Sequence, residues 1–454
     1  MRKARCRVAQ RPPLTRMPRQ IFAAAGRLCY HAIPRRECSR IPARVESAKE
    51  ASMAMPKTAL EGIRVLDLGR YQAGPRIGLV LARLGAEVIK VEAPGGDESR
   101  SMGPFVRGQS AYWVQYNSGK KSLGLDMRHE KGKEIVRELV KVSDILIQNF
   151  RPGTIATMGF GYDKLKALNP RIIMVNVSAY GQDGPYRDRI GFDPIGQAIS
   201  GMMSLTGFPG TPPTKTYNPV IDRITALHGT IGTLAALRER ELSGEGQCID
   251  VCLADTGFSM TEIQCAAYLG AGIVPERAGN GRGLQNTYET SDGWVLIAAS
   301  SDNIWPRVCK AIEAPEWVND PRFRSVSDRA QAGAVIEERL TAWFAAHTVQ
   351  EAIALFSGNG IPINAVNDIP TAAHEPQLHE RELLVEVPDP VAGRMHVSGK
   401  PIKLSRSEVV VGSAPLPGQH TAEILTALLH YTPEEVQKLQ AEQAIYCHAE
   451  TVAG

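Results

Sequence analysis

The hydrophobic positions of the chain change their spacing repeatedly after about residue 55. Short apolar runs that suit buried strands lie at Ile63–Leu68, Glu87–Glu92, Asp144–Asn149 and Ile172–Val177. Between them, apolar residues recur at helical spacing over Arg76–Leu84, Glu130–Val142 and Tyr162–Leu168. Strands that alternate with helices favour right-handed crossovers and a mostly parallel sheet. We therefore expect an α/β domain of the doubly wound type.

The later part of the chain continues the pattern and then breaks it. Helical spacing at Asp222–Leu242 and Ala254–Ala271 flanks the strand-like segment Gln247–Leu253, and the Gly-rich segment Gly279-Asn-Gly-Arg-Gly283 follows. Beyond it come a strand at Trp294–Ala299 and a helix at Asp328–Ala346. Glycine-rich punctuation marks a boundary. We expect a large domain over 56–278, a linker with a small α/β domain over 279–390, and a segment over 391–454 that returns to the large domain.

Residues 1–55 form a basic extension that we expect to lie outside the fold. Residues 1–52 hold 13 Lys and Arg against 3 Asp and Glu, without sustained periodicity. Two interpretations compete: a mitochondrial transit peptide, which would place the protein in the matrix, or a start site assigned too early, because Met53-Ala-Met-Pro-Lys resembles a natural beginning. The second implies a cytoplasmic protein. Under either interpretation, we expect the extension to be dispensable.

The positive net charge of the chain comes from this extension. The whole chain is +4, but residues 53–454 hold 39 basic against 45 acidic side chains. A mildly acidic body argues against nucleic acid as the main ligand, because phosphate backbones need clustered cations. No apolar run approaches the roughly 18 to 20 residues that span a bilayer. The Cys residues are scattered without CxxC or Cys/His spacing, so we expect no metal site and reduced thiols.

Three loops could carry chemistry. The first is Gly69-Arg-Tyr-Gln-Ala-Gly-Pro75, which is not a GxGxxG or P-loop motif and is either a ligand-binding turn or a structural one. The second, Asn149-Phe-Arg-Pro-Gly153, offers Arg151 to a phosphate or to solvent. The third places Asp193 at a helix start, where spacing alone favours an N-cap. His228 lies in an apolar helix and is expected in the core. No nucleophile elbow or HExxH motif is present, so hydrolases and metalloenzymes lose support.

These loops, in this order, resemble the class III coenzyme A-transferases, the family that includes formyl-CoA:oxalate and carnitine CoA-transferases. The resemblance covers about Leu60 to Leu429. Its matching segments are Leu60-Glu-Gly-Ile-Arg-Val-Leu-Asp-Leu68, Gln72-Ala-Gly-Pro75, Leu84-Gly-Ala-Glu-Val-Ile-Lys-Val-Glu92, Asn117-Ser-Gly-Lys-Lys-Ser-Leu123, Asn149-Phe-Arg-Pro-Gly153, Gly191-Phe-Asp193, Thr206-Gly207, Gly244-Glu-Gly-Gln247, Asp292-Gly293, Gly360-Ile-Pro362 and Gly418-Gln-His-Thr421.

The resemblance implies a Rossmann-like large domain, a smaller α/β domain and an interlocked homodimer. It also implies that CoA moves from an acyl-CoA donor to a small free carboxylic acid, with the CoA thioester as substrate and no tightly bound cofactor. Asp193 would be the nucleophile, forming an aspartyl anhydride and then an aspartyl-CoA thioester, and Gln72 would stabilise the oxyanions. The implied CoA-binding residues are Arg70, Ala73, Asn149, Phe150, Arg151 and Tyr180, and the implied mobile substrate loop contains Gly279, Asn280 and Gly281.

Departures from the family pattern leave the substrate open. Arg70 stands where the best-described transferases have His, and Thr157 where the family often has Arg. Leu284-Gln285 replaces a Pro-Tyr pair. Arg70 and Arg282 could hold a second carboxylate or be solvated, so the donor and acceptor acids are not identified.

Two rival functions remain. The first is an α-methylacyl-CoA racemase, which shares the implied fold but passes a proton between His and Asp. Phe192 stands where racemases commonly have His, and Gly153–Tyr180 contains no His. The second is a non-enzymatic CoA or nucleotide-binding module, which would not need a positioned nucleophile at Asp193.

Overall fold

The computed structural model describes residues 57–281 and 283–448. The chain divides into two units, Met1–Ala54 and Met55–Gly454, of which the second contains all the described elements. The predictions made for residues 1–55, and the role suggested for Arg282, lie outside the described residues.

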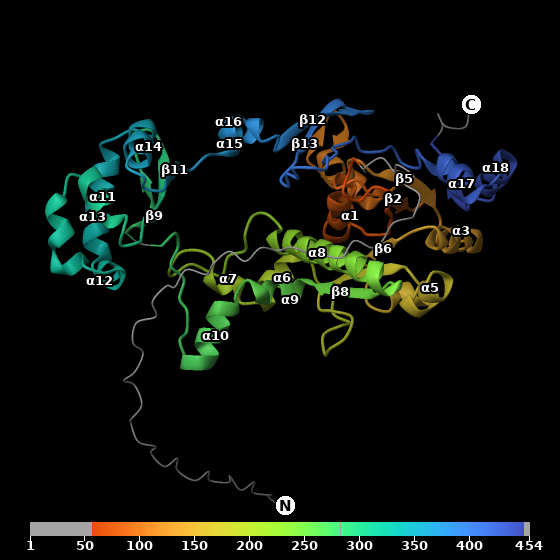
Figure 1. Cartoon of the computed structure of the whole chain (residues 1–454), viewed down its shortest axis with the longest axis horizontal. Coiled ribbons are helices and arrows are strands. Elements are labelled where there is room, and N and C mark those ends of the chain that lie inside the picture. Colours follow the sequence, from red (N-terminus) through yellow and green to blue (C-terminus); the bar gives the residue numbers. More distant parts are fainter. Residues whose placement is uncertain (1–56, 282, 449–454) are drawn as a thin grey trace, which may run out of the picture. The chain divides into compact units, whose positions relative to one another are not determined.

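A seven-stranded sheet organises the described chain (Figure 1), and its spatial order is β14-β5-β2-β1-β6-β7-β8. Its strands are β1 (Arg64–Asp67), β2 (Glu87–Glu92), β5 (Lys121–Leu125), β6 (Ile145–Gln148), β7 (Ile173–Ser178), β8 (Cys248–Cys252) and β14 (Ile445–Tyr446). All neighbours are parallel except β14, which pairs antiparallel with β5. The expected α/β fold with a mostly parallel sheet is therefore confirmed.

The strand order reverses direction between β1 and β6. From β1 the chain proceeds outward to β2 and β5, whereas β6, β7 and β8 extend on the opposite side. The crevice at the carboxyl end of such a switch point is where open α/β sheets bind their ligands. The loops that follow β1 and β6 are the first two chemistry-bearing loops of the sequence.

Helices cover both faces of the sheet. Successive strand residues point to opposite sides, so the apolar residues of each strand supply a core on either face. Leu66 and Ile89 belong to the core cluster that includes α3 (Glu130–Lys141), α5 (Tyr162–Leu168), α17 (Thr421–Leu429) and α18 (Pro433–Ala441). Their chain neighbours Val65 and Val88 join the opposite cluster, with α1 (Ala73–Arg83) and α8 (Val220–Ser243). Strands buried on both faces read as nearly continuous apolar runs.

A separate core lies in the later chain. The antiparallel strands β9 (Gln285–Glu289), β10 (Trp294–Ala298) and β11 (Ile363–Ala365) pack with α11 (Trp305–Ala311), α13 (Gly333–Ala345) and α14 (Val349–Gly358). Buried aromatic rings, among them Trp305, Phe344 and Phe356, fill this core.

A hairpin of β12 (Leu384–Asp389) and β13 (Gly393–Ser398) instead packs on Trp113 of α2 (Ala111–Asn117). The expected boundary at 390/391 falls in the turn of this hairpin, so residues before the boundary also pack with the large domain. The other expected domain limits, at 278/279 and at residue 56, stay predictions.

Two expected helices are interrupted, so these predictions were wrong. The segment Ala254–Ala271 forms α9 (Leu253–Ser259) and α10 (Glu262–Ala271). At the break, the Thr261 hydroxyl donates to the Ser200 carbonyl at 2.8 Å, so a side chain takes the place of regular helix bonding. The segment Asp328–Ala346 forms α12 (Val326–Gln331) and α13, divided at Ala332. The remaining short elements are β3 (Phe105–Val106), β4 (Gln109–Ser110), α4 (Thr154–Thr157), α6 (Asp193–Ile199), α7 (Met202–Leu205), α15 (Ile369–Ala373), α16 (Pro376–Glu380) and the 3-10 helices Glu98–Ser101, Pro315–Asn319 and Pro321–Phe323.

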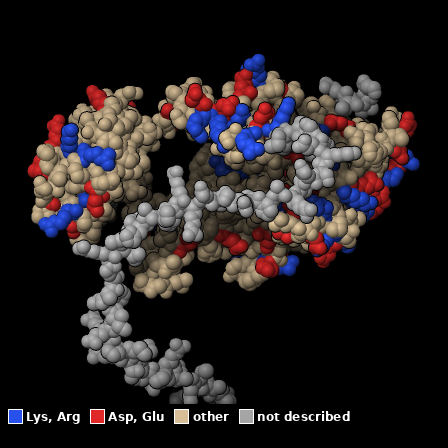
Figure 2. Space-filling view, in the orientation of Figure 1, with Lys and Arg blue, Asp and Glu red and all other residues tan. Residues whose placement is uncertain are grey.

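The surface carries charges of both signs. On the face shown in Figure 2, acidic and basic side chains are interspersed over the described residues. No helix within the described ranges combines the length and apolar character needed to cross a bilayer.

Candidate active site

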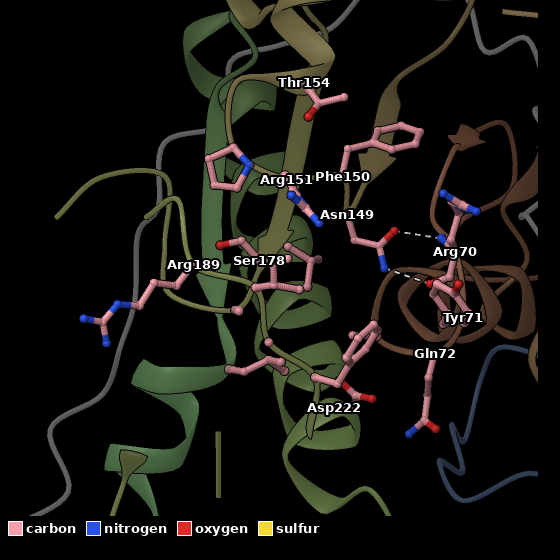
Figure 3. Close-up of a pocket in the computed structure, with 18 residues that line it drawn as sticks. Arg70, Tyr71, Gln72, Asn149, Phe150, Arg151, Thr154, Ser178, Arg189 and Asp222 are labelled. Atoms are coloured by element: carbon pink, nitrogen blue, oxygen red, sulfur yellow. Dashed lines mark hydrogen bonds between the residues drawn. The ribbon is translucent and has the colours of Figure 1, made fainter. Parts of the chain in front are cut away.

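A pocket of about 390 Å³ opens at the carboxyl edge of the sheet, beside the strand-order reversal (Figure 3). Its walls come from the loops after β1, β6 and β7, together with Asp222 of α8 and Leu253 of α9. Of the residues implied by the sequence, it is lined by Arg70, Gln72, Ala73, Asn149, Phe150 and Arg151. Segments that are far apart in the chain thus meet at one site.

Buried charges shape the loop after β1. The Asp67 carboxylate accepts the Gly69 N–H at 2.8 Å and pairs with Lys120 Nζ at 2.6 Å. Lys120 also donates to the Pro75 carbonyl at 2.8 Å, and Lys90 donates to the Gly69 carbonyl. Burial lowers the pKa of Lys120 to about 8. Removing one partner of such a pair leaves an uncompensated buried charge, so this network is a strong constraint on the loop.

The glycines of this loop serve close packing. A Cβ at Gly69 would lie 2.9 Å from both Asp67 Oδ1 and Pro75 Cδ. A Cβ at Gly74 would lie 3.3 Å from Asn149 Cγ. Sequence left open whether this was a structural or a ligand-binding turn; the two glycines are required by the turn itself, whereas the residues between them line the pocket.

Asn149 joins the first two loops. Its Oδ1 accepts the Arg70 N–H at 2.7 Å, and its Nδ2 donates to the Arg70 carbonyl at 2.8 Å (Figure 3). The Phe150 N–H donates to Gln148 Oε1 at 2.7 Å. Two reciprocal hydrogen bonds occupy the Asn149 amide, so its part in the site is to hold Arg70 in place.

Glu98, which was not identified from the sequence, binds the side chains of both Arg70 and Tyr71. Its carboxylate pairs with the Arg70 guanidinium and accepts the Tyr71 hydroxyl at 2.5 Å. The hydrogen bond to Glu98 is the largest cause that raises the pKa of Tyr71. Tyr71 has φ of 61°, a conformation that costs a residue with a side chain of order 1 kcal/mol or more and persists only when neighbours impose it.

Asp193 is buried, with 4% of its surface exposed, and it is held by three donors. Its Oδ1 accepts the backbone N–H groups of Ile221 at 2.6 Å and Asp222 at 3.1 Å, and its Oδ2 accepts Gln197 Nε2 at 2.5 Å. Phe192 is the N-cap of α6 and Asp193 lies inside that helix. The interpretation of Asp193 as an N-cap of its own helix is therefore wrong, because its carboxylate binds the first turn of α8.

The same turn of α8 contacts Gln72. Gln72 is buried, and its Nε2 donates to the Pro219 carbonyl at 3.3 Å. Residues Pro219 to Asp222 therefore connect Gln72 with Asp193. Asp193 itself is not among the residues that line the pocket, whereas its chain neighbour Phe192 and its hydrogen-bond donor Asp222 both line it.

Two further cations line the pocket. Arg189 lies over the Tyr186 ring, 3.7 Å from its centroid. Within the described part of the chain, no ion pair or hydrogen bond occupies the Arg151 guanidinium. Arg151 is exposed and points into the pocket in Figure 3, so it is available to an anionic ligand.

A second cavity, of about 520 Å³, shares Arg70 and Phe150 with the first. It lies at the carboxyl ends of β2 and β5. Its lining combines apolar Leu125, Met127 and Met158 with Arg128 and with the acidic residues Glu92, Asp97, Glu98 and Asp126. Arg128 pairs with Asp126 at 3.0 Å. Sequence reasoning missed it. The available signal was the run Leu125-Asp-Met-Arg128 directly after a strand that was itself not predicted.

The structure does not bring every expected residue to the pocket. Tyr180 lies outside its lining, with its ring edge-on to Tyr186 at 5.9 Å between centroids. Gly281 lines a different cavity of about 610 Å³. Asn280 donates to Thr287 Oγ1 at 2.8 Å, and a Cβ at Gly279 would lie 2.6 Å from the Phe208 ring. Over the described residues, no cluster of three His, Cys, Asp or Glu side chains could hold a metal ion.

Comparisons with known proteins identify the family of the chain. The profile of the family described as CoA-transferase family III matches residues 60–421. The chain is similar to succinyl-CoA–D-citramalate CoA-transferase of Chloroflexus aurantiacus, with 36% identity over 401 residues that cover 87% of this chain and 100% of the relative. It is also similar to succinyl-CoA:glutarate CoA-transferase of Mus musculus, with 34% identity over 86% of this chain and 91% of the relative.

A solved structure gives the same result. A CAIB/BAIF family protein from Brucella suis aligns with a TM-score of 0.73 and 32% identity, covering 82% of this chain and all of that one. The chain therefore belongs to CoA-transferase family III, and it is a CoA-transferase. The family resemblance is confirmed, and the racemase alternative is not favoured.

Proposed function

We propose that the protein moves CoA from an acyl-CoA donor to a free carboxylate through covalent intermediates on Asp193. The observation that carries the proposal is the buried Asp193 carboxylate, which lies against the first turn of α8 together with Gln72. Oδ1 accepts two backbone N–H groups, whereas Oδ2 accepts one hydrogen bond, from the buried Gln197 amide, which Thr216 also holds. Oδ2 is therefore the oxygen that we assign as the attacking atom.

The reaction follows from carboxylate chemistry. Asp193 attacks the donor thioester carbonyl, the carbon–sulfur bond breaks, and an aspartyl anhydride and CoA thiolate result. The thiolate then attacks the aspartyl carbonyl and releases the donor acid, which leaves CoA on Asp193. The acceptor carboxylate reverses both steps, so one nucleophile divides a difficult exchange into easier ones.

Gln72 is the oxyanion donor in this proposal. Gln72 lines the pocket, and within the described residues its amide forms a single hydrogen bond, to the Pro219 carbonyl at 3.3 Å. A bond of that length is weak, so exchange for a developing oxyanion costs little. A preorganised donor of this kind is typically worth about 10²- to 10³-fold in rate.

We place the nucleotide end of CoA across the two cavities. Arg70 lines both of them, Arg151 faces the first, and Arg128 faces the second. Guanidinium groups suit phosphates because they present several fixed donors. The apolar Leu125 and Met158 of the second cavity suit a planar base.

We propose a dicarboxylyl-CoA, such as succinyl-CoA, as the donor. The two relatives described above are named as succinyl-CoA enzymes. Arg189 and Arg151 supply cations in the pocket that a distal carboxylate could bind, even if Arg70 is occupied by phosphate.

We also propose a homodimer. Helix α10 has no buried residue although it carries Ile263, Tyr268 and Leu269, whose exposed fractions are 74%, 56% and 83%. Ile231 of α8 is 63% exposed, and His228, expected in the core, is exposed on the same helix. Apolar faces of this extent suit a subunit interface.

The test uses succinyl-CoA with citramalate, malate, glutarate and acetate in turn. Transfer to at least one dicarboxylate, together with a hydroxamate on the Asp193 peptide after hydroxylamine treatment, is the expected result. Failure to move CoA with any acid would overturn the transfer. Exchange of the α-hydrogen of 2-methylacyl-CoA for deuterium without transfer would instead support the racemase.

A further inference from the structure

A carboxyl group other than that of Asp193 lines the pocket. Asp222 lies in the first turn of α8 and lines the same pocket as Gln72 and Phe192. Figure 3 shows its carboxyl directed toward the side of the pocket where Tyr71 and Gln72 lie. Its backbone N–H donates to Asp193 Oδ1 at 3.1 Å, and no hydrogen bond from the described residues occupies its side chain.

The surroundings of Asp222 favour a neutral carboxyl. Asp193 of α6 is its charged neighbour, and burial followed by the charge of Asp193 raises the pKa of Asp222 to about 7. Tyr112 and Tyr116 of α2 face it, since the charge of Asp222 contributes to raising the pKa of each tyrosine. The charges of Arg223 of α8 and Arg76 of α1 lower the pKa of Tyr116.

A structural role alone explains this position poorly. An acid in the first turn of a helix normally stabilises the helix as an anion, through the positive end of the dipole. Here burial and a neighbouring carboxylate work against that charge. A group that faces a pocket, adjoins the proposed nucleophile and has a pKa raised to about 7 fits proton transfer better than helix stabilisation.

We propose that Asp222 is a catalytic acid and base that protonates the departing CoA sulfur and later takes the proton back, an inference that rests on the transfer reaction proposed above. When Asp193 attacks and the carbon–sulfur bond breaks, the Asp222 proton passes to sulfur, giving CoA thiol and an Asp222 carboxylate. As sulfur attacks the aspartyl carbonyl, Asp222 recovers the proton. The acceptor half-reaction repeats the exchange, so no proton is gained or lost over a cycle.

The proton transfer is favourable in the required direction. A thiol has an ordinary pKa of about 8.5, so a thiolate is more basic than a carboxylate that titrates near neutrality. Keeping the sulfur as a thiol also limits premature return of a reactive thiolate. Because Asp222 becomes charged beside the aspartyl anhydride rather than beside a free Asp193 carboxylate, the like-charge repulsion is absent at that moment.

The test compares Asp222→Asn with Asp163→Asn. Asp163 also lies in the first turn of a helix, α5, but is exposed and lines neither substrate cavity. We expect Asp222→Asn to lower kcat by about 10²- to 10³-fold with KM for the acyl-CoA changed less than about threefold, as for a lost general acid. Asp163→Asn should behave as the wild type. Circular dichroism checks that both variants fold.

The pH dependence of the wild-type rate is a second test of the role of Asp222. The single-turnover rate of aspartyl adduct formation should fall as the pH rises through about 7, where Asp222 loses its proton. In Asp222→Asn this descending limb should disappear. A kcat within threefold of wild type in the variant, or a wild-type rate without that limb, would overturn the role of Asp222. A wild type that forms no adduct on Asp193 at any pH would overturn the transfer mechanism instead. An adduct on Asp222 would show that Asp222 is the nucleophile and would refute its role as the acid.

Discussion

The ring of Phe192 meets the ring of Tyr71 edge to face, with their centroids 5.9 Å apart. Phe192 directly precedes Asp193, and Tyr71 directly precedes Gln72. The contact therefore joins the two segments that carry the proposed nucleophile and oxyanion donor. Glu98 accepts the hydrogen bond of the Tyr71 hydroxyl and so helps to hold the Tyr71 ring in this contact.

If Arg70 binds the CoA phosphates as proposed, Glu98 competes with them for its guanidinium. Both side chains of this ion pair are about half exposed, and exposed pairs contribute at most about 1 kcal/mol to stability. We expect Glu98→Gln to leave the unfolding midpoint nearly unchanged and to lower KM for acyl-CoA about two- to fivefold at low salt, because Arg70 is released to the CoA phosphates. Steady-state kinetics at two salt concentrations measures this effect.

The matched control is Glu130→Gln. Glu130 also pairs with basic residues, Lys133 and Arg137, but it lies on α3 outside both cavities. Its KM should not change. A KM that rises in Glu98→Gln would show that Glu98 positions Tyr71 more than it occupies Arg70.

Asp193→Asn tests the covalent step. The side chain keeps its size and an oxygen for the Ile221 and Asp222 N–H groups, so folding should survive. The amide cannot attack a thioester, and we expect turnover to fall by about 10³-fold or more. Mass spectrometry should find no hydroxamate on this peptide. Asp188→Asn, in an exposed loop position, is the control, and comparable losses in both variants would contradict a specific role for Asp193.

The fold was predictable where local pattern and tertiary environment agree. β2 occupies the expected residues Glu87–Glu92 because both of its faces are buried and its apolar run is nearly continuous. β5 was not predicted, since Lys121-Ser-Leu-Gly-Leu125 contains Ser and Gly and becomes a strand through pairing with β2. β14 has two residues and exists only by pairing with β5. Pairing of this kind is not encoded in a local window.

The sequence predicted which loops form the pocket, but not which side chains contact one another there. Arg70, Gln72 and Asn149 were named, and the pocket brings them together. Glu98 and Asp222 were missed because each looks like an ordinary acid at the start of a helical segment. Their significance depends on neighbours supplied by other parts of the chain: Tyr71 for Glu98, and Asp193 for Asp222.

The titration of Asp222 should appear in stability as well as in catalysis. Its pKa is raised to about 7 in the folded protein, above the roughly 3.9 of an unfolded Asp. Between these values the folded state holds more protons than the unfolded state, so this group contributes stability at low pH that is lost as the pH rises through about 7.

The variant Asp222→Asn lacks this linkage. We expect the unfolding midpoint of the wild type to decrease relative to that of Asp222→Asn when the pH is raised from about 5 to 8. Thermal unfolding at several pH values provides the measurement. Parallel curves for the two proteins over that range would show that Asp222 is ionised throughout.

The exposed apolar face of α10 is a candidate for the proposed dimer interface. Leu269 is 83% exposed on a helix that buries none of its own residues against the described chain, and a subunit interface would remove this apolar surface from water. We expect Leu269→Asp to weaken dimerisation by about 10²-fold or more, since a charge would be desolvated at the centre of the contact. Val142→Asp is the control, because Val142 is exposed at the end of α3.

Sedimentation velocity over a dilution series should show a dimer for the wild type and the control, and a monomer for Leu269→Asp at concentrations where the wild type remains associated. A wild type that sediments as a monomer at micromolar concentration, or a Leu269→Asp variant that associates as tightly as the control, would contradict this interface.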